Sequence, residues 1–339
     1  MIIIISVSLF VLAGCGKNNE RELYLFNWTY YTPDEMIAQF EEEFDCKVHL
    51  DYYSANEEML SKLQAGASGY DIVFPSQNFV EIMIKEDMLL SLDKSRLPNI
   101  KNVNKTILQR LRYDTEMNYA VPYGATTGGI AVNTEMVPEY EKSWSIFERE
   151  DLKNKMSMLD DPRETMSATH IYLGHDVNTT DDADLAELED VLKNKWAPNL
   201  VKFDAEGFGK SFAAGNYWVS HGYAEAIFSE VPEDKWDTFD YFIPEEGATL
   251  FIDSMCILKG SKHYDLALEF INFVHRPEVY SIFLDYFQFP AILNMEAANY
   301  TTKQPMYEVG DISRYQTPLD VGVDFIKYSS IWERVRMDY

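Results

Sequence analysis

Strand and helix patterns alternate along the first 86 residues, and this alternation limits the possible folds more than any other feature of the chain. Short apolar runs bounded by turn residues are typical of strands, and apolar residues three or four apart are typical of helices. A β-α-β-α-β order requires a parallel sheet whose connections cross over in the right-handed sense. The sequence therefore predicts an α/β fold, with strands at 23–26, 47–52 and 71–74 and helices at 33–44, 56–65 and 77–86.

The alternation continues through the rest of the chain, and a run of small residues at 124–129 interrupts it. Strands are expected on either side of this run, at 119–123 and 130–133. Small residues absorb changes of backbone dihedral angle, so the run predicts a hinge or a crossing between two domains. The remaining expected elements are helices at 184–193, 208–214 and 264–274 and strands at 201–203 and 251–258.

The N-terminus has the pattern of an export signal. Residues 2–13 are apolar apart from two serines, and this run is shorter than the roughly 20 residues that span a bilayer. The sequence Leu12-Ala13-Gly14-Cys15 is similar to the bacterial lipobox, in which the signal is cut before a cysteine that then carries lipid. An ordinary signal peptide, or a buried strand with a chance cysteine, is the alternative. We expect 1–14 to be a signal peptide, Cys15 the lipidation site and 15–22 a polar tether, which places the protein in the periplasm on a lipid anchor.

Charge and aromatic residues indicate the kind of ligand. The chain has 56 acidic and 29 basic residues and a net charge of −27, which argues against nucleic acid and anionic lipid surfaces as partners. Trp28 and Tyr31 follow the first strand, just before a helix that Thr32 is expected to cap and Pro33 to begin. Ligands of open α/β sheets bind at this end of the strands. Two aromatic rings there, in an acidic chain, predict a protein that receives a cation.

Patterns for catalysis and metal binding are weak. The six histidines lack the i,i+4 or H-x-H spacing that places two imidazoles on one metal. Paired phenolates can bind ferric iron, but alternation along a strand would bury one ring of the pair Tyr52-Tyr53. Cys46 and Cys256 each lie in an apolar, strand-like context and are expected to be buried free thiols. We expect no catalytic residue, metal or cofactor.

Five segments carry a resemblance to a known family: YLFNWTYYTPDEMIAQFEEEF, SANEEMLSKLQAGASGYDIVFPS, LDDPRETM, FIDSMCI and ALEFINFVHRPEV. In this order they resemble the periplasmic spermidine/putrescine-binding proteins of ABC transporters, which have the type II solute-binding fold. The resemblance covers nearly all of the mature chain. It implies two α/β domains joined by crossing strands, a ligand cleft between them, and delivery of the ligand to a membrane permease by a monomer without enzymatic activity. The expected domains are 23–128 with 250–296, and 129–249 with 297–339.

The resemblance also implies the residues of a polyamine slot. Aromatic faces pack the methylene groups of a polyamine and attract its ammonium groups. Carboxylates must meet the amines, because a desolvated ammonium without a partner is very costly. The expected lining is Trp28, Tyr31 and Ser76 from the first domain, Asp161 and Glu164 from the second, and Asp253 within FIDS.

The chain departs from the family at several slot positions. Glu225 resembles, in position, an acidic residue of putrescine-selective relatives, and Gln316 is only a candidate for the C-terminal glutamine of the family. The slot stays aromatic but loses hydroxyl groups and one large indole, which leaves the choice between putrescine and spermidine open. The substitutions are Asn78 and Phe289 for tyrosines and Tyr223 and Phe251 for tryptophans.

Other roles are compatible with the same residues. A binding protein for a sugar or for ferric iron could share the fold, although a sugar site does not require charge compensation. Thiamine-degrading enzymes resemble these binders and use a cleft cysteine, which here would have to be Cys256. That residue lies three positions past Asp253, so alternation along the strand points it to the opposite face. The acidic pair before Pro162, Asp160 and Asp161, could act as a helix cap as well as a ligand group.

Overall fold

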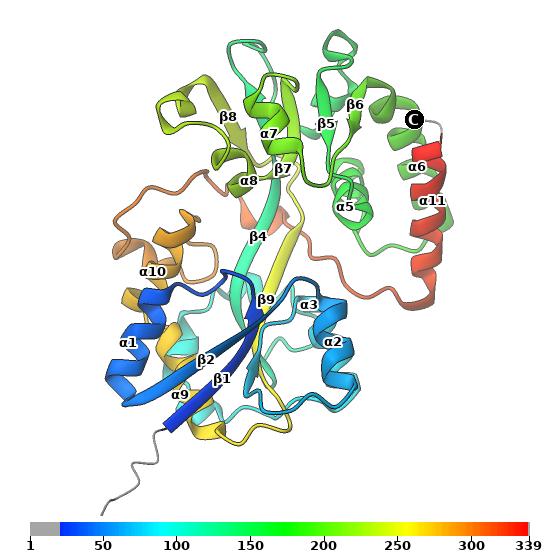
Figure 1. The fold of residues 1–339 in the computed structure, drawn as a ribbon. Helices are drawn as coiled ribbons and strands as arrows, with labels where there is room; N and C mark the ends of the chain where they lie inside the picture. Colours follow the sequence, from blue (N-terminus) through cyan, green and yellow to red (C-terminus); the bar gives the residue numbers. More distant parts are fainter. Residues whose placement is uncertain (1–20, 338–339) are drawn as a thin grey trace, which may run out of the picture.

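Two lobes make up the molecule. The computed structural model describes residues 21–337, so Cys15 and the expected signal peptide lie outside the described residues. The long strands β4 (Ala120–Asn133) and β9 (Leu250–Ile257) run between the lobes (Figure 1). Helices flank the strands of each lobe, which confirms the α/β class.

The N-terminal lobe begins with the predicted parallel crossovers. β1 (Arg21–Trp28) lies between β2 (Cys46–Tyr53) and β3 (Ile72–Val73), and it is parallel to both. β1 starts two residues before the predicted run, because Arg21 and Glu22, expected in the tether, pair with the start of β2. The helices of this segment are α1 (Asp34–Phe44), α2 (Asn56–Gln64) and α3 (Gln77–Lys85).

The start of α1 differs from the prediction. Pro33 occupies the cap position, and no side chain caps the helix. The Thr32 hydroxyl instead accepts a hydrogen bond from the Asn27 amide at 2.7 Å and lies 3.0 Å from the hydroxyl of Tyr123. These buried contacts hold Thr32 toward the core, so the expected cap is wrong and the residue anchors the loop that carries Tyr31.

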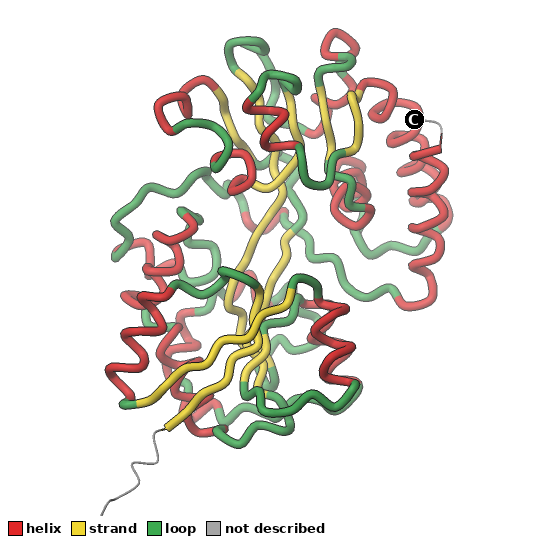
Figure 2. The backbone as a smooth tube through the Cα atoms, viewed as in Figure 1, coloured by secondary structure: helices red, strands yellow, loops and turns green. Residues whose placement is uncertain are grey.

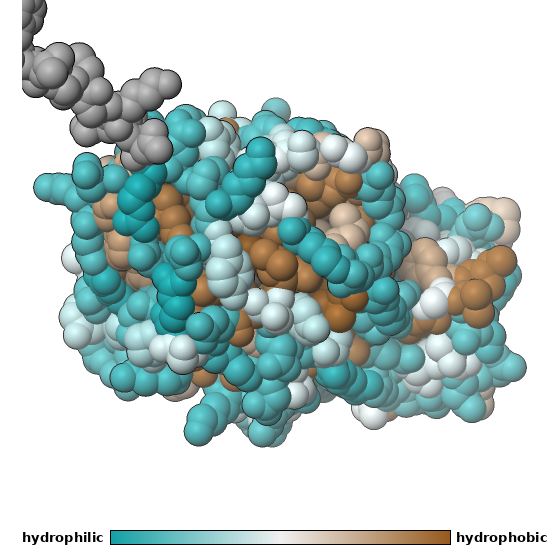
Figure 3. Space-filling model, turned by 90° about the horizontal axis from the view of Figure 1, so that it is seen from below, coloured by the Kyte–Doolittle hydropathy of each residue, from teal (hydrophilic) through white to brown (hydrophobic). Residues whose placement is uncertain are grey.

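The chain returns to the N-terminal lobe after β9, as α9 (Tyr264–Val274) and α10 (Pro277–Phe287). The ring of Phe40 on α1 meets Phe270 and Phe273 of α9 at centroid distances of 5.0 and 5.3 Å. The lower face of this lobe is mostly hydrophilic, with apolar side chains visible in the gaps (Figure 3). Within residues 21–337, no helix has the length and apolar character needed to span a bilayer.

The C-terminal lobe has its own parallel strands. β5 (Met156–Met158) lies between β6 (Leu200–Phe203) and β7 (Val219–Tyr223), parallel to both, and β8 (Phe239–Phe242) pairs with β4. The helix expected at 184–193 is α6 followed by a π-helical turn, Val191–Trp196. The helices of this lobe are α5 (Pro162–Leu173), α6 (Asp182–Asp190), α7 (Phe208–Ala213), α8 (Ala224–Phe228) and α11 (Phe325–Met337). Earlier in the chain, a short helix α4 (Lys105–Leu108) precedes β4.

One nine-stranded sheet runs through both lobes (Figure 2). Eight of its strands follow the order β2-β1-β3-β9-β4-β7-β5-β6, and the ninth, β8, pairs with β4 outside this order. β4 is one continuous strand, so the two separate strands expected at 119–123 and 130–133 are wrong, but the strand does cross between the lobes at 124–129, which is one of the two predicted roles of this run. It pairs with β9 before residue 128 and with β7 from 128 onward. Because the glycines there have no Cβ, they leave room for side chains of neighbouring segments. A Cβ on Gly124 would lie 1.9 Å from the Tyr31 hydroxyl, and one on Gly128 would lie 2.2 Å from Glu164 Oε1. The small residues thus permit close packing where the strand crosses from one lobe to the other.

Candidate functional site

Asp253 is the central carboxylate of the candidate site. It lies half-buried on β9, opposite Gly124 of β4. The Ser76 hydroxyl, at the end of β3, donates a hydrogen bond of 2.6 Å to Asp253 Oδ1. Burial raises the pKa of Asp253 to about 6, and the nearby hydroxyls of Ser76 and Tyr31 oppose this rise. A carboxylate that carries its charge at such a cost is suited to a cationic ligand.

Asn56, at the start of α2, holds Ser76 in place. Its side-chain amide donates to Ser76 Oγ at 3.0 Å and accepts a bond of 3.2 Å from the Ser76 backbone N–H. Because Ser76 Oγ accepts from Asn56, its own proton is free to point at Asp253. Sequence reasoning missed Asn56, because its contact with Ser76 spans 20 residues of chain.

Two expected aromatic residues lie at the end of β1 and in the loop that follows it, and one of them, Tyr31, has its hydroxyl near Asp253. Trp28, at the end of β1, is half-buried and donates its indole N–H to the Phe74 carbonyl at 2.9 Å. Tyr31 packs edge-on against Tyr123 and Phe283 at 5.3 and 5.7 Å. The Tyr31 hydroxyl is buried and has no hydrogen-bond partner among the described residues. Burial, and then the charge of Asp253, raise the pKa of this phenol well above its usual value, so it stays protonated and able to donate.

The second acidic group lies at the N-terminus of α5. Asp161 caps the helix, because its carboxylate accepts the backbone N–H of Glu164 at 3.0 Å, which confirms the predicted cap. Glu164 is fully buried, and its Oε1 lies 3.3 Å from Nε2 of His221 on β7. Glu164 Oε2 has no hydrogen-bond partner among residues 21–337.

Tyr223 connects the two acidic groups. It ends β7 and is half-buried. Burial raises the pKa of its phenol well above the usual value, and Glu164, Asp161, Glu225 and Asp253 raise it further, in that order. Carboxylates of both lobes therefore raise the pKa of this one phenol. The expected site residues Tyr223, Glu225 and Asp253 lie in one electrostatic neighbourhood, although they are far apart in the sequence.

The charges of this neighbourhood are poorly compensated by the protein. Burial raises the pKa of Glu225 as well, which lies half-buried in the first turn of α8. Among the described residues, the only ion pair formed by Asp161, Glu164, Glu225 or Asp253 is that of Glu164 with His221. A buried carboxylate without a cation is costly, so this arrangement favours a ligand that supplies positive charge.

The family model for bacterial extracellular solute-binding proteins matches residues 35–307. The chain belongs to this family. The matched region includes strands of both lobes and both acidic groups of the candidate site.

Relatives of this solute-binding protein support the same placement. The putrescine/cadaverine-binding protein of Pseudomonas aeruginosa is 36% identical over 279 residues, which cover 78% of this chain and 77% of that protein. The spermidine/putrescine-binding periplasmic protein of Escherichia coli is 30% identical over 336 residues, or 96% and 94% of the two chains. The crystal structure of the TpPotD lipoprotein of Treponema pallidum matches with a TM-score of 0.86 at 45% identity, covering 93% of this chain and 99% of that chain. These matches confirm the predicted family and its type II fold.

Two expected slot residues have structural partners in this solute-binding protein. Phe289 is buried and stacks on Phe287 at a centroid distance of 4.9 Å, in the core behind Tyr31. The amide of Gln316 donates to the His175 carbonyl at 2.9 Å and accepts the Val177 N–H at 3.1 Å. Both ends of this amide brace a loop of the C-terminal lobe, so a ligand contact of Gln316 stays a prediction.

Two other expected residues lie on β9 or on the neighbouring α3, and their contact with a ligand stays a prediction. Asn78, in the first turn of α3, and Phe251, on β9, are both half-buried. The residue before Asn78 is one that the sequence reasoning missed. The buried Gln77 accepts the Ile252 N–H at 2.9 Å and donates to the Pro318 carbonyl at 3.0 Å. Its amide therefore ties α3 to β9 and to the segment that leads to α11.

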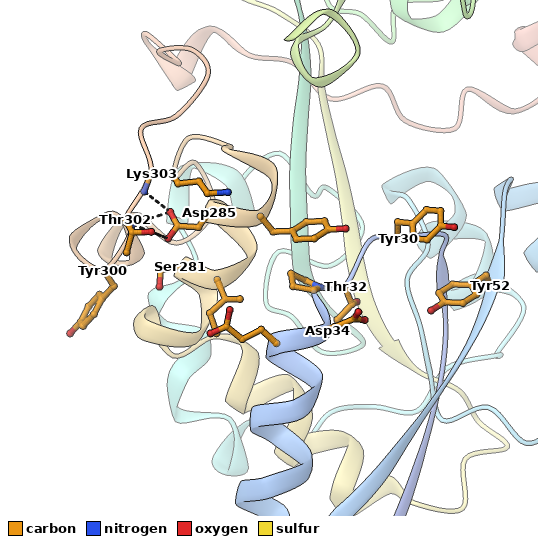
Figure 4. A pocket seen from close by; sticks show the side chains of 13 residues that line it. Tyr30, Thr32, Asp34, Tyr52, Ser281, Asp285, Tyr300, Thr302 and Lys303 are labelled. Carbon is orange, nitrogen blue, oxygen red and sulfur yellow. Dashed lines mark hydrogen bonds between the residues drawn. The ribbon is translucent and has the colours of Figure 1, made fainter. Parts of the chain in front are cut away.

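A separate surface cavity of about 540 Å³ lies beside the loop before α1 (Figure 4). Tyr30 and Tyr52 stand on one side, and Asp285 accepts hydrogen bonds from Thr302 and Lys303 on the other. None of the expected slot residues lines it. The Asp285 carboxylate already accepts the backbone N–H groups of Thr302 and Lys303, so this cavity does not share the chemistry around Asp253.

The thiols that carried an alternative function are buried, and the Tyr52-Tyr53 pair has one buried and one exposed ring. Cys46 and Cys256 are buried free cysteines, as predicted, and burial raises the pKa of the Cys256 thiol well above its usual value. Tyr53 is buried and donates its hydroxyl to the Phe74 carbonyl at 2.6 Å, while Tyr52 is exposed, as alternation predicts. Within residues 21–337, no three His, Cys, Asp or Glu residues form a group that could hold a metal ion.

Proposed function

We propose that this solute-binding protein captures a polyamine, either putrescine or spermidine, for an ABC importer. One observation carries the proposal: half-buried and buried carboxylates of both lobes lie around the ring of Tyr223, while His221 is the only basic side chain that the described residues pair with any of them. A ligand with several ammonium groups on an apolar chain fits such a site. The relatives named for putrescine, cadaverine and spermidine support the same class of ligand.

The proposed binding mode follows from the positions of the charges. One ammonium would pair with Asp253, which Ser76 already orients, and a second would meet Glu164 or Glu225 in the other lobe. Trp28 and Tyr31 would pack on the methylene groups between them, and each cation–π contact contributes ~0.5–2 kcal/mol.

Domain closure is the proposed mechanism. A ligand that bridges carboxylates of both lobes binds the closed form better than the open form and shifts the equilibrium toward it. The proposed domains are 23–128 with 250–296, and 129–249 with 297–339. The strands β4 and β9 cross the boundary, so rotation would concentrate at their crossing points.

The remaining parts of the proposal concern location and partners. A signal peptide cut before Cys15 would leave a lipid-anchored monomer in the periplasm, where it would deliver its ligand to the permease subunits of the inner membrane. The TpPotD relative is itself described as a lipoprotein. An enzymatic role through Cys256 is disfavoured, because the raised thiol pKa opposes formation of the nucleophilic thiolate.

Calorimetric titration tests the proposed function. The soluble chain from residue 20 would be titrated with putrescine, spermidine and spermine, and with maltose and ferric citrate as controls for the alternative ligands. The proposal predicts micromolar or tighter binding of one polyamine per chain, weakened by salt. Binding of maltose or ferric citrate with no response to any polyamine would overturn it.

A further inference from the structure

His221 is a buried polar residue to which the sequence reasoning gave no role. It lies on β7, and neither its side chain nor that of Glu164 is exposed. Its Nε2 lies 3.3 Å from Glu164 Oε1, across 57 residues of chain. Because alternation along a strand places residues two apart on the same face, His221 shares its face with Tyr223.

The pair is only partly satisfied. Glu164 Oε2 and His221 Nδ1 are both buried, and neither has a hydrogen-bond partner among the described residues. Buried polar atoms are normally paired, so an unpaired carboxylate oxygen beside a ligand site marks a place where the ligand can bind. The charge of Glu164 also raises the pKa of the Tyr223 phenol, so this carboxylate lies near the aromatic part of the site.

The contacts of the imidazole come from three elements besides its own strand. β4 offers it the backbone at Gly128, whose missing side chain leaves room for both Glu164 Oε1 and His221 Nε2. Trp144 lies edge-on to the ring at 5.0 Å. On the strand of His221 itself the neighbouring titratable group is the Tyr223 phenol, and α5 offers Glu164. That carboxylate is the one charged side chain that residues 21–337 place within hydrogen-bond distance of the ring.

We propose that His221 is a positioning residue for Glu164: it holds Oε1 and leaves Oε2 for a ligand amine. Without this contact the buried carboxylate could turn, and Oε2 would no longer be fixed toward the ligand. The inference rests on the proposed function and deepens it, because it assigns the orientation of one ligand-binding carboxylate to a residue of β7.

Calorimetric titration of spermidine is the test. It would be done on the wild-type protein and E164Q at one pH, so that titration of Asp253, with a pKa of about 6, is the same in both. We expect E164Q to bind more weakly, because the proposal pairs a ligand amine with this carboxylate.

Two further variants separate positioning from folding. H221L removes the contact to Glu164, and we expect it to bind at least about tenfold more weakly, while H221Q recovers most of that loss because its amide can still donate to Oε1. In an E164Q background, H221L should add little to the loss of affinity, because position 164 then has no charged oxygen to be positioned. Thermal unfolding shows whether each variant is folded.

The outcomes are distinguishable. If wild-type protein binds polyamines and H221L binds them equally well, or weakens binding as much in the E164Q background as in wild-type protein, the role of His221 is refuted and the proposed function stands. If wild-type protein binds no polyamine, the proposed function fails, and the inference fails with it.

Discussion

Replacement of Asp253 by asparagine separates ligand binding from stability. The side chain keeps its size, and its amide oxygen can still accept the Ser76 hydroxyl that now lies 2.6 Å from Oδ1. The negative charge that would meet a ligand amine is lost. The variant therefore tests the charge of Asp253 with little change in the packing around it.

The expected loss of affinity follows from the environment of the carboxylate. Removing one partner of a desolvated charge pair leaves the other charge unpaired, which costs about 2 kcal/mol or more. On this basis D253N binds polyamines about 30-fold more weakly or worse. The effect should persist in high salt better than that of a surface charge, because Asp253 is half-buried.

The unliganded variant should be more stable than the wild-type protein at pH 7. Burial raises the pKa of Asp253 from 3.8 to about 6, so the folded state binds its proton more tightly than the unfolded state does. Stability of the wild-type protein therefore falls as the pH rises from about 4 to about 6, and the loss is complete above pH 6. D253N has no charge to bury and escapes this loss.

Calorimetry and thermal unfolding at pH 5 and pH 7 measure both effects. Asp237→Asn is the matched control, because Asp237 is exposed and lies outside the candidate site. It should change neither binding nor the pH dependence of unfolding. Near-normal polyamine affinity of D253N would refute the assignment, and an unliganded D253N less stable than wild-type at pH 7 would refute the argument from burial.

Three further changes have defined outcomes. Trp28→Ala should weaken polyamine binding by ~0.5–2 kcal/mol in calorimetry, and an unchanged affinity would mean that the ring only packs against its own lobe. Gly124→Ala places a Cβ 1.9 Å from the Tyr31 hydroxyl, so it should lower both the midpoint of thermal unfolding and the affinity; Gly260→Ala, with open surroundings, should do neither. Cys15→Ser should move the protein from the membrane to the soluble fraction of cells, and continued membrane attachment would contradict lipidation at this residue.

Local patterns predicted most of the secondary structure of this protein. Helix α9 was expected at 264–274 and is found at Tyr264–Val274, because its apolar residues follow the helical period closely. The parallel pairing of the first three strands was also expected, since connecting helices leave few other topologies. The errors arose where long-range contacts override local preference. Thr32 binds the core instead of capping α1, and the small residues at 124–129 admit side chains without ending β4.

The candidate site was less predictable than the fold. Asp253 stood out because a carboxylate within an apolar strand requires a reason, and the structure gives it the Ser76 contact. Asn56 and His221 were missed because each acts on a residue distant in the sequence. For His221 a signal existed: it precedes Tyr223 by two positions on one strand, and alternation alone places both on the same face.

A crystal structure of the spermidine complex tests the central claim most directly. The account predicts one ammonium within hydrogen-bond distance of Asp253 and another at Glu164 or Glu225, with Trp28 and Tyr31 along the methylene groups. Spermidine bound elsewhere, for instance in the surface cavity beside Tyr30, or bound without contact to a carboxylate of each lobe, would contradict it.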